Sequence, residues 1–542
     1  MTRRARGGAP APAAPSQARS LLAGAVVFLA GCAVFAPTLG YSFLNWDDDV
    51  YILRNPWIRA FDATNLRAVF TQPYFQNYLP LHLLSYMVDH ALWGLRAMGY
   101  HLSSVLLHGL NAVLCLLVVR RMSRSLAIAF LAALLFALHP SHVEAVAWVS
   151  SRKEVLSTTF LLLSLLFYLP SRRGAARKPW AYVASVLFFL GAMLSKVSVV
   201  VLPAFLLLLD AAPPGPGPRA RPSWGRALAE KIPYGVVGAI LIFVNSRVQV
   251  TARGAYAQDP LRYLTVKGHA VWNYLGLLFG LGGNPDYDLP RIAGAGTLLA
   301  LAGWLALPVA GYALYRSRRR LEFLGVAWVL LALLPALLFP LVTYMADRYL
   351  YAPSIGFCWA VAAALVSMGA APGTPARAVA VALGILLVGL FTVRTLDQSR
   401  HWKDSETLWT YALTRSGDFR VYNNLAQVRA GQKRWSEAEQ LLRRGAAVPN
   451  VTSWQSLGVL HYTMGRYPEA LAETDRALAI LATKAPDPAL LAELRYNRGA
   501  VLWSMGKPQE AADEWRAALR ADPRHAQARE WLGEATRARG GS

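Results

Sequence analysis

The sequence predicts an all-α protein in two parts, a polytopic membrane helix bundle followed by a tetratricopeptide α-solenoid. Of the 542 residues 55% are hydrophobic, and the mean hydropathy is +0.32, which is too apolar for a soluble chain of this length. Long apolar segments alternate with short basic loops as far as about residue 395. Beyond it, apolar positions recur at helical spacing within charged sequence, which indicates paired amphipathic helices.

Arginine clusters give the expected topology of the apolar segments. Arg120-Arg121, Arg172-Arg173 and Arg318-Arg319-Arg320 follow alternate segments, and the positive-inside rule assigns such clusters to the cytoplasm. With a cytoplasmic N-terminus this predicts about eleven spans and an extracytoplasmic C-terminal domain. The spans are expected at 20–39, 101–119, 126–140, 154–169, 180–195, 197–209, 232–247, 297–315, 322–341, 350–368 and 376–393.

Two apolar segments do not fit this alternation. Residues 81–95 and 264–282 carry ionisable side chains, and we expect them to be interfacial or re-entrant helices on the external face. If either of them spans, the count changes. Leu29-Ala30-Gly31-Cys32 is similar to a lipoprotein processing site, but the apolar run continues to Leu39, which favours an uncleaved first span.

Composition sets the expected domains and excludes some partners. Residues 1–20 are expected to be a disordered cytoplasmic tail, residues 21–395 the membrane domain and residues 396–542 the repeat domain. Most of the net charge of +24 lies in short loops and sets the topology of a multi-pass protein in the inner (plasma) membrane, so we expect no nucleic-acid partner. The three cysteines lie far apart in apolar segments, so no disulfide framework is expected.

The C-terminal part contains internal repeats of the tetratricopeptide type. Small residues occur where paired helices touch, and large ones where a groove between helices is filled. Such arrays present a concave surface that binds peptides, and the alternative is a purely structural cap on the membrane domain. The pattern is found at Trp454, Leu457, Gly458, Gly465, Ala470 and Ala477, at Gly499, Gly506, Ala511, Trp515, Ala518 and Pro523, and more weakly at Tyr422, Leu425, Ala426, Ala438 and Leu442.

Acidic residues follow the first span, at Asp47, Asp48 and Asp49. Three adjacent carboxylates repel one another, so they need a cation or a proton-sharing partner. One of them could be a general base toward an acceptor hydroxyl, and another could orient the substrate. Asp47 and Asp48 could also hold a divalent cation, the only cofactor that the sequence suggests. A solvated acidic turn is the alternative.

Cationic residues follow other spans, where they could bind a phosphate. Either Arg152 or Lys153 could bind the phosphate. His142 and Glu144, a few positions earlier, could be metal ligands, but no third ligand is adjacent to them. Lys196 lies at a tight turn between two apolar segments, where a lysine is costly. Asp347-Arg348 could form an internal ion pair, or Arg348 could contact a phosphate that Asp347 orients.

The order of these motifs resembles the TMTC-type (transmembrane and tetratricopeptide repeat) glycosyltransferases of the GT-C superfamily, in a bacterial form. The resemblance covers residues 20–540. The motifs that carry it are Asn45-Trp46-Asp47-Asp48 with Tyr51-Ile52 and Asn55-Pro56, Tyr78-Leu79-Pro80-Leu81, Tyr100-His101-Leu102 with His108, His139-Pro140 through Glu144-Ala145-Val146-Ala147-Trp148 with Arg152 and Glu154, and Asp347-Arg348-Tyr349-Leu350-Tyr351.

The resemblance implies an inverting glycosyltransferase with a polyprenyl-phosphate-linked sugar donor. The implied acceptor is a hydroxyl of a protein or a glycan on the external face. The acceptor that fits the family best is a protein Ser or Thr, as in O-mannosylation. Its acidic pair matches Asp47 and Asp48, although Asp49 leaves open which pair is functional, and its second carboxylate matches Glu144. The expected catalytic residues are therefore Asp47, Asp48 and Glu144, and the expected substrate-binding residues are His142, Arg152, Lys196, Asp347 and Arg348.

Two other functional classes fit part of the pattern. A transporter would also combine a polytopic bundle with intramembrane Lys and His, but the charged groups cluster at the external rim and no inverted repeat is evident. An assembly scaffold without catalysis would use the repeats to recruit partners, but an anchor needs only one or two spans. We therefore expect a donor lipid, an acceptor held by the repeat groove and the lipid bilayer as partners.

Overall fold

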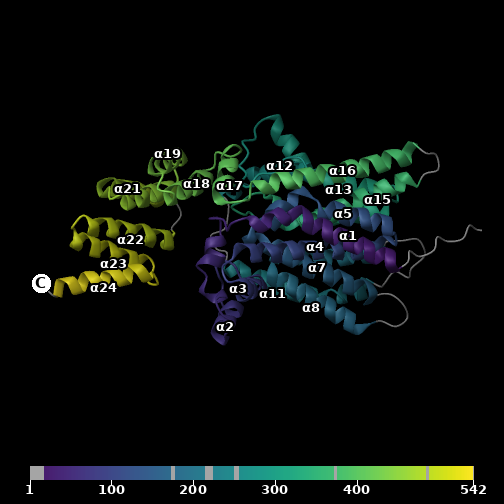
Figure 1. Cartoon of the computed structure of the whole chain (residues 1–542), viewed down its shortest axis with the longest axis horizontal. Helices are drawn as coiled ribbons and strands as arrows, with labels where there is room; N and C mark the ends of the chain where they lie inside the picture. The colour runs from purple at the N-terminus through teal and green to yellow at the C-terminus, as the bar shows by residue number, and fades with distance from the viewer. Residues whose placement is uncertain are drawn as a thin grey trace, which may run out of the picture. The chain divides into compact units, whose positions relative to one another are not determined.

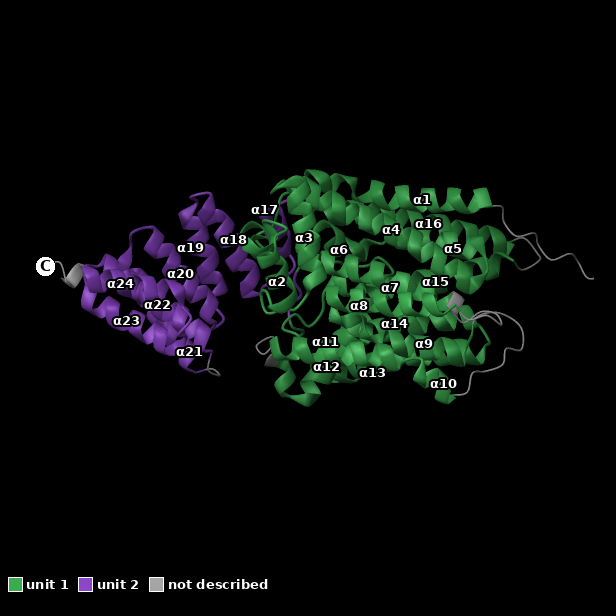
Figure 2. Cartoon of the chain, turned by 90° about the horizontal axis from the view of Figure 1, so that it is seen from below, with its two compact units in different colours: residues 1–285, 289–403 green, residues 286–288, 404–542 purple. Residues whose placement is uncertain are grey.

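The computed structural model describes residues 17–171, 178–213, 224–248, 255–370, 375–483 and 487–540, and every named element in these ranges is helical. This confirms the predicted all-α class. The chain divides into two compact units, Met1–Pro285 with Leu289–Lys403, and Asp286–Asp288 with Asp404–Ser542 (Figure 2). Most of the expected N-terminal tail lies outside the described residues, as does Arg172-Arg173, whereas residues 17–20 belong to the first helix.

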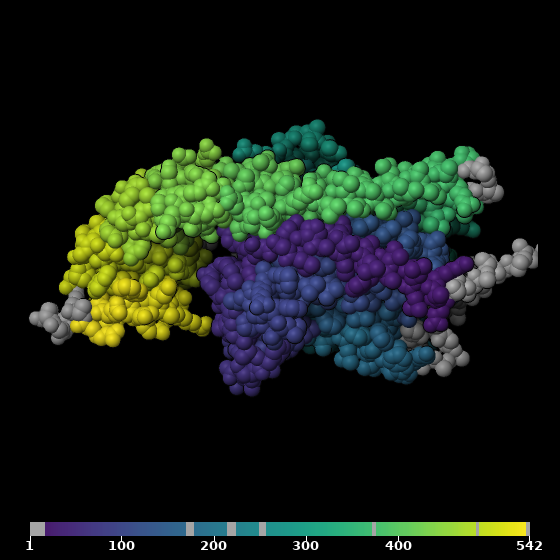
Figure 3. All heavy atoms as spheres, viewed as in Figure 1, coloured from purple at the N-terminus to yellow at the C-terminus, as the bar shows by residue number. Residues whose placement is uncertain are grey.

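The first unit is a bundle in which helices far apart in sequence lie side by side. For example, α16 packs along α1, as the green and purple atoms show in Figure 3. Its helices, labelled in Figure 1, are α1 (Gln17–Phe35), α2 (Ala63–Thr71), α3 (Pro80–Trp93), α4 (Ala97–Ser123), α5 (Leu126–Ala137), α6 (Val143–Ala147), α7 (Arg152–Ser171), α8 (Pro179–Ser195), α9 (Leu202–Ala211), α10 (Trp224–Ala229), α11 (Ile232–Val248), α12 (Pro260–Leu278), α13 (Ala295–Arg316), α14 (Arg320–Leu338), α15 (Pro353–Gly369) and α16 (Pro375–Arg400).

Six described segments are long and apolar enough to cross a membrane, and α5 with Pro140–Ala147 makes a seventh if this pair, bent by 50°, is one span. Three other apolar helices are shorter, and neither α3 nor α12 is among the candidates. The chain is therefore a multi-pass membrane protein, while the total of eleven spans stays a prediction. The six segments are Gln17–Gly40, Ala97–Ser123, Trp224–Val248, Ala295–Arg316, Arg320–Leu338 and Pro375–Arg400.

The bend after α5 follows from Pro140. A proline has no N–H and cannot continue a helix, so the chain turns there and restarts as α6. The His139 ring stabilises the turn, because one ring nitrogen lies 3.3 Å from the Ser141 amide and the other 3.0 Å from the Leu278 carbonyl oxygen. The turn carries Glu144 into the interior of the unit, where its side chain is buried.

Two neighbouring helices, α4 and α7, hold Arg152 and Arg121 at opposite ends of the bundle. Near the N-terminal ends of α4 and α7, Arg152 donates to the Tyr100 carbonyl at 2.6 Å. Toward their C-terminal ends, Arg121 donates to the Leu166 carbonyl. The two helices are therefore parallel, and Arg152 lies at the opposite end of the bundle from Arg121.

The second unit is built from helix pairs. Small residues let the helices of a pair touch: a Cβ at Gly458 would lie 2.8 Å from Thr474 Oγ1, and one at Gly499 would lie 2.5 Å from the Trp515 ring. The repeat helices are thus paired as the sequence pattern predicts. They are α17 (Ser405–Leu413), α18 (Phe419–Gly431), α19 (Trp435–Gly445), α20 (Val451–Thr463), α21 (Tyr467–Ala482), α22 (Pro488–Ser504), α23 (Pro508–Ala521) and α24 (Ala526–Gly540).

We predict that Gly268→Ala destabilises the bundle. A Cβ at Gly268 in α12 would lie 2.1 Å from the Ala300 carbonyl oxygen in α13, so the two backbones would have to separate. Overpacking of this kind typically costs about 1–3 kcal/mol. Thermal unfolding in detergent should show a lower Tm than the wild type. Gly276→Ala on the same helix is the matched control, because nothing lies within 4 Å of its added Cβ; equal melting of both variants would contradict the prediction.

Candidate active site

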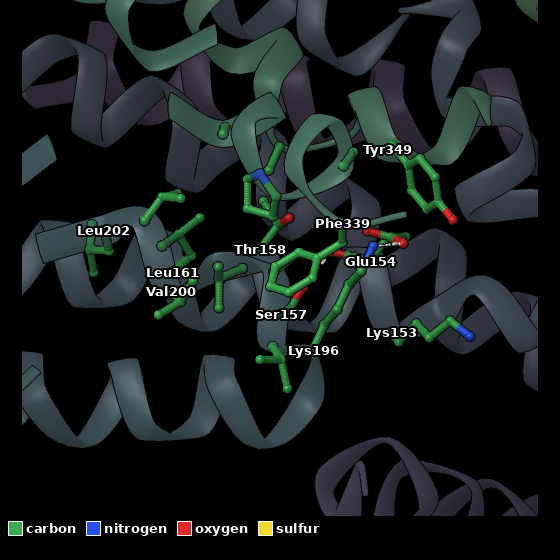
Figure 4. Close-up of a pocket in the computed structure, with 18 of the residues that line it drawn as sticks. Lys153, Glu154, Ser157, Thr158, Leu161, Lys196, Val200, Leu202, Phe339 and Tyr349 are labelled. Carbon is green, nitrogen blue, oxygen red and sulfur yellow. Dashed lines mark hydrogen bonds and ion pairs between the residues drawn. The ribbon is translucent and has the colours of Figure 1, made fainter. Parts of the chain in front are cut away.

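One cavity of about 440 Å³ lies within the first unit, and its lining changes character from one end to the other. Apolar side chains from α7, α9 and the preceding turn form one part, including Leu161, Val200 and Leu202. Charged and polar side chains gather at the other part, where Lys153 and Tyr349 lie in Figure 4. A cavity with this lining suits a molecule that joins a hydrocarbon chain to an anionic group.

The three aspartates after α1 have different surroundings. Asp49 is paired with Arg54, and about a third of its side chain is exposed. Asp48 is almost fully buried, whereas Asp47 is only partly buried and has the unusual backbone angle φ 65°. Because Asp47 adopts a left-handed conformation, its side chain leaves the turn in a different direction from those of its neighbours.

Asp48 fastens the loop to the rest of the unit. Its Oδ2 accepts a hydrogen bond from the Leu44 amide at 2.9 Å, and its Oδ1 accepts from the Ser150 amide at 2.9 Å and from the Ser150 hydroxyl. Burial raises the pKa of Asp48 to about 7, although these hydrogen bonds oppose the shift. Such a pKa would suit a general base, but both oxygens are occupied and only 1% of the residue is exposed, so the geometry favours a structural role.

Two cationic groups of the cavity affect the pKa of Asp47. Burial raises its pKa, the positive charges of Lys153 and Arg348 lower it, and the negative charge of Asp49 raises it. Lys153 and Arg348 both line the cavity. Asp47 does not itself line the cavity, but its charge interacts with two cations that do, so it has the surroundings of a proton acceptor close to the polar end.

Glu144 holds Arg348 in a fixed orientation. One carboxylate oxygen accepts from the Arg348 backbone amide at 2.8 Å, and the other accepts from its guanidinium. The guanidinium carbon also lies 5.3 Å from the centre of the Trp148 ring and 5.0 Å from that of Tyr349. Both Glu144 oxygens are thus engaged, so the structure gives this residue the role of orienting Arg348.

Lys196 and Lys153 complete the polar end of the cavity. Lys196 forms an ion pair with Glu154, and its ammonium lies 5.0 Å from the centre of the Tyr349 ring. Lys153 has no carboxylate within ion-pair distance among the described residues, and its ammonium lies 5.7 Å from the Tyr51 ring centre. Lys153 is therefore the cavity lysine whose charge is least compensated.

Three predicted substrate-binding residues do not line this cavity. Arg152 is 1% exposed and is paired with Asp89 at 2.5 Å, so its charge is used within the bundle. His142 is fully buried, with Nε2 2.7 Å from the Ser354 hydroxyl. Asp347 is also buried. Their positions argue against direct contact with a ligand in this cavity, in contrast to what the sequence suggested.

Asp48 lacks the free oxygens that a divalent cation would need. A hard cation needs several free oxygen ligands, but both Asp48 oxygens already accept hydrogen bonds from the protein. Among the described residues, no group of three or more His, Cys, Asp or Glu side chains is arranged to hold a metal ion. We therefore assign Asp48 no role as a metal ligand.

Sequence reasoning gave Lys153 only as an alternative to Arg152 and did not single out the Tyr349 ring. A stack of three tryptophans was also missed: the Trp46 and Trp148 ring centres are 4.6 Å apart, and those of Trp46 and Trp402 are 6.1 Å apart. The Trp148 ring nitrogen donates to the Trp46 carbonyl at 2.7 Å. This stack stabilises the backbone beside Asp47, and no local sequence signal links Trp402 to the other two.

The family model that describes the tetratricopeptide repeat matches residues 496–540. Protein O-mannosyl-transferase Tmtc1 of Drosophila melanogaster is 24% identical over 79% of this chain and 62% of its own length, and human TMTC1 is 26% identical over 78% and 54%. Mouse TMTC2 is 35% identical over 28% of this chain and 19% of its length. The chain thus spans about half to three fifths of the length of Drosophila Tmtc1 and human TMTC1.

Among solved structures, ArnT from Cupriavidus metallidurans bound to undecaprenyl phosphate overlaps 87% of this chain and 82% of its own, with 14% identity and a TM-score of 0.38. Because the TM-score is this low, the structural overlap does not establish a relationship to ArnT. The evidence for a family relationship comes from the sequence matches. Those matches cover more than three quarters of this chain and confirm the resemblance that the motifs indicated.

Proposed function

Because the chain is a relative of the TMTC-type protein O-mannosyl-transferases, we propose that it is a membrane glycosyltransferase. It moves a sugar from a polyprenyl-phosphate donor to an acceptor hydroxyl. The proposed acceptor is the hydroxyl of a Ser or Thr side chain of a protein. The observation that carries the proposal is a cavity whose apolar walls lead to Lys153, Lys196 and Arg348; the charges of Lys153 and Arg348 also act on Asp47.

The donor is matched to the cavity in two parts. The prenyl chain lies along apolar walls such as those at Leu161, Val200 and Phe339 (Figure 4). Its phosphate lies at the polar end, near Lys153 and Arg348. Lys153 supplies charge that no carboxylate of the described chain offsets by an ion pair, and Arg348 supplies a guanidinium that Glu144 already orients.

In the reaction, the acceptor oxygen attacks the anomeric carbon of the sugar and inverts its configuration. The bond from that carbon to the phosphate oxygen breaks, and polyprenyl phosphate leaves with the bonding electrons. Asp47 takes the proton of the attacking hydroxyl. Arg348 and Lys153 stabilise the charge that develops on the leaving phosphate, and this preorganised electrostatic contribution is the larger one in a cavity of low polarity.

The reaction is placed on the external face of the inner membrane, with the N-terminus in the cytoplasm. Support for this orientation comes from the alternation of Arg120-Arg121 and Arg318-Arg319-Arg320 with the acidic motifs. The tetratricopeptide unit is then extracytoplasmic, and we infer that its groove binds the acceptor protein.

The proposal is tested with purified protein in vesicles that contain a radiolabelled polyprenyl-phosphate mannose. Transfer of label to a protein of the cell envelope, together with release of polyprenyl phosphate, is the expected result. Solute movement across the vesicle membrane without any transfer would instead identify a transporter and reject the proposal.

We predict opposite pH shifts from two neighbours of Asp47. A base must be ionised, so the rate falls as pH falls through the pKa of Asp47, which burial raises. Asp49→Asn removes a negative charge that raises this pKa, so the acid limb of kcat/KM should move to lower pH. Lys153→Met removes a positive charge that lowers the pKa, so the limb should move to higher pH. Profiles that shift in the same direction, or not at all, would exclude Asp47 as the titrating group.

A further inference from the structure

A segment of the cavity wall is held in place by side chains from a different part of the fold. Residues 339–346, here called the strap, connect α14 to Asp347. Phe339, Pro340 and Leu341 of the strap are apolar residues that line the cavity, and Arg348 and Tyr349, which also line it, come two and three positions after the strap ends. The position of the strap therefore determines the shape of one cavity wall.

Pro340 leaves the end of α14 short of hydrogen-bond donors. In a continued helix, the Ala336 carbonyl would accept from the amide of residue 340, but proline has none. The Leu341 amide does not continue the helix either, because it donates to the Phe339 carbonyl at 2.9 Å. Carbonyl groups of the last turn of α14 must consequently find donors elsewhere.

Side chains of α12 and of the turn before it supply those donors. Lys267 Nζ donates to the Ala336 carbonyl at 2.7 Å and to the Tyr344 carbonyl at 3.0 Å. The Tyr263 hydroxyl lies 2.9 Å and 2.7 Å from the carbonyl oxygens of Leu337 and Leu338. The Tyr256 hydroxyl donates to the Leu341 carbonyl at 2.9 Å, in the middle of the strap.

Lys267 is unusual among these donors because it bonds to the last turn of α14 and to the strap at once. It is fully buried, and no carboxylate of the described chain lies within ion-pair distance of it. Its other neighbour is the Tyr256 ring, whose centre is 5.7 Å from the ammonium. A buried lysine whose charge is met by carbonyl oxygens and a ring is costly, so its position calls for a function.

We propose that Lys267 is a positioning residue for the lipid chain of the donor: it joins the end of α14 to Tyr344 and thereby fixes the strap as the apolar wall of the cavity. This inference rests on the proposed function for the identity of the ligand. Lys267 itself does not line the cavity, so its effect on binding passes through Phe339, Pro340 and Leu341.

The first test measures the strap itself and needs no substrate. Hydrogen exchange of residues 339–346 is compared between the wild type, Lys267→Met and Tyr256→Phe. Methionine keeps the length of the side chain but donates no hydrogen bond, so exchange should rise by about tenfold or more. Tyr256→Phe removes a single donor with its ring intact and should give a smaller rise, which keeps the test decisive if Lys267→Met folds poorly. Exchange equal to that of the wild type in both variants would overturn the inference.

The second test separates a wall for the lipid from a general loss of structure. The Kd of a long-chain polyprenyl phosphate and of a short-chain one are measured for the same variants. Lys267→Met should raise the Kd of the long-chain compound by about tenfold and that of the short-chain compound by less than about threefold. An equal rise for both compounds would overturn the inference.

Lys231→Met is the matched control for burial of a lysine. Lys231 is 5% exposed and is paired with Asp210 at 2.5 Å, away from the strap. This variant should change neither exchange of the strap nor the ratio of the two Kd values. If the wild type binds neither polyprenyl phosphate, the proposed function fails, and the exchange data still decide whether Lys267 fixes the strap.

Discussion

Asp47→Asn should lower kcat by about 10²–10⁴-fold while the variant still folds and still binds polyprenyl phosphate. Asparagine has nearly the same shape as aspartate but cannot accept the proton of the acceptor hydroxyl. It also tolerates the left-handed backbone of this position, where φ is 65°, so the turn should persist. Single-turnover transfer from a radiolabelled donor measures the rate, and the Kd of polyprenyl phosphate measures binding.

The neighbouring aspartates provide controls that are matched in chemistry but differ in structure. Asp48→Asn turns an NH2 group toward one of the donors at Leu44 or Ser150, so it should reduce stability by about 1–3 kcal/mol. Asp49→Asn breaks only a half-exposed pair with Arg54 and should have little effect on kcat. A rate near that of the wild type in Asp47→Asn, with a large loss in Asp48→Asn at full stability, would transfer the role of base to Asp48.

The difference between these aspartates could not be predicted from the sequence. The sequence places three carboxylates in a row, and their order alone assigns none of them a partner. The partners of Asp48 are Leu44, four positions before it, and Ser150, about a hundred positions after it. Only the tertiary fold brings Ser150 there, and with it the burial that makes Asp48 structural.

Arg152 and Lys153 are a second case in which the sequence could not distinguish the roles of adjacent residues. Consecutive residues of a helix point about 100° apart, so adjacent cations at the start of α7 face different surroundings. Lys153 faces the cavity, and Arg152 faces Asp89 on α3. A sequence pattern can place a cation at a helix start, but the choice between neighbours depends on which helices pack against each side.

The fold was more predictable than the site because its signals are repeated. Long apolar segments indicated the membrane helices, and the tetratricopeptide patterns that include Gly458 and Gly499 indicated the paired helices of the second unit. Glu144 and Arg348 were both singled out from their motifs, yet their pairing across about two hundred residues was not foreseen. Periodicity reports local structure, whereas an ion pair of this separation is set by packing.

Arg348→Gln should lower kcat by about 10²–10³-fold, because it removes a preorganised cation from the leaving phosphate. It should also destabilise the protein by about 3–5 kcal/mol, since the buried Glu144 carboxylate, 1% exposed in its side chain, would lose its partner. The loss of rate and the loss of stability therefore have different causes. Rates of transfer and thermal unfolding in detergent are measured on the same preparations.

The double variant Arg348→Gln with Glu144→Gln separates the two causes. It removes both charges of the pair, so stability should largely return while kcat stays low. Arg152→Met with Asp89→Asn is the matched control, because it removes a buried pair that does not line the cavity and should leave kcat within about threefold of the wild type. If the Arg348/Glu144 double variant recovered the rate as well as the stability, Arg348 would act only through the fold, and the phosphate would have to be held by Lys153 and Lys196.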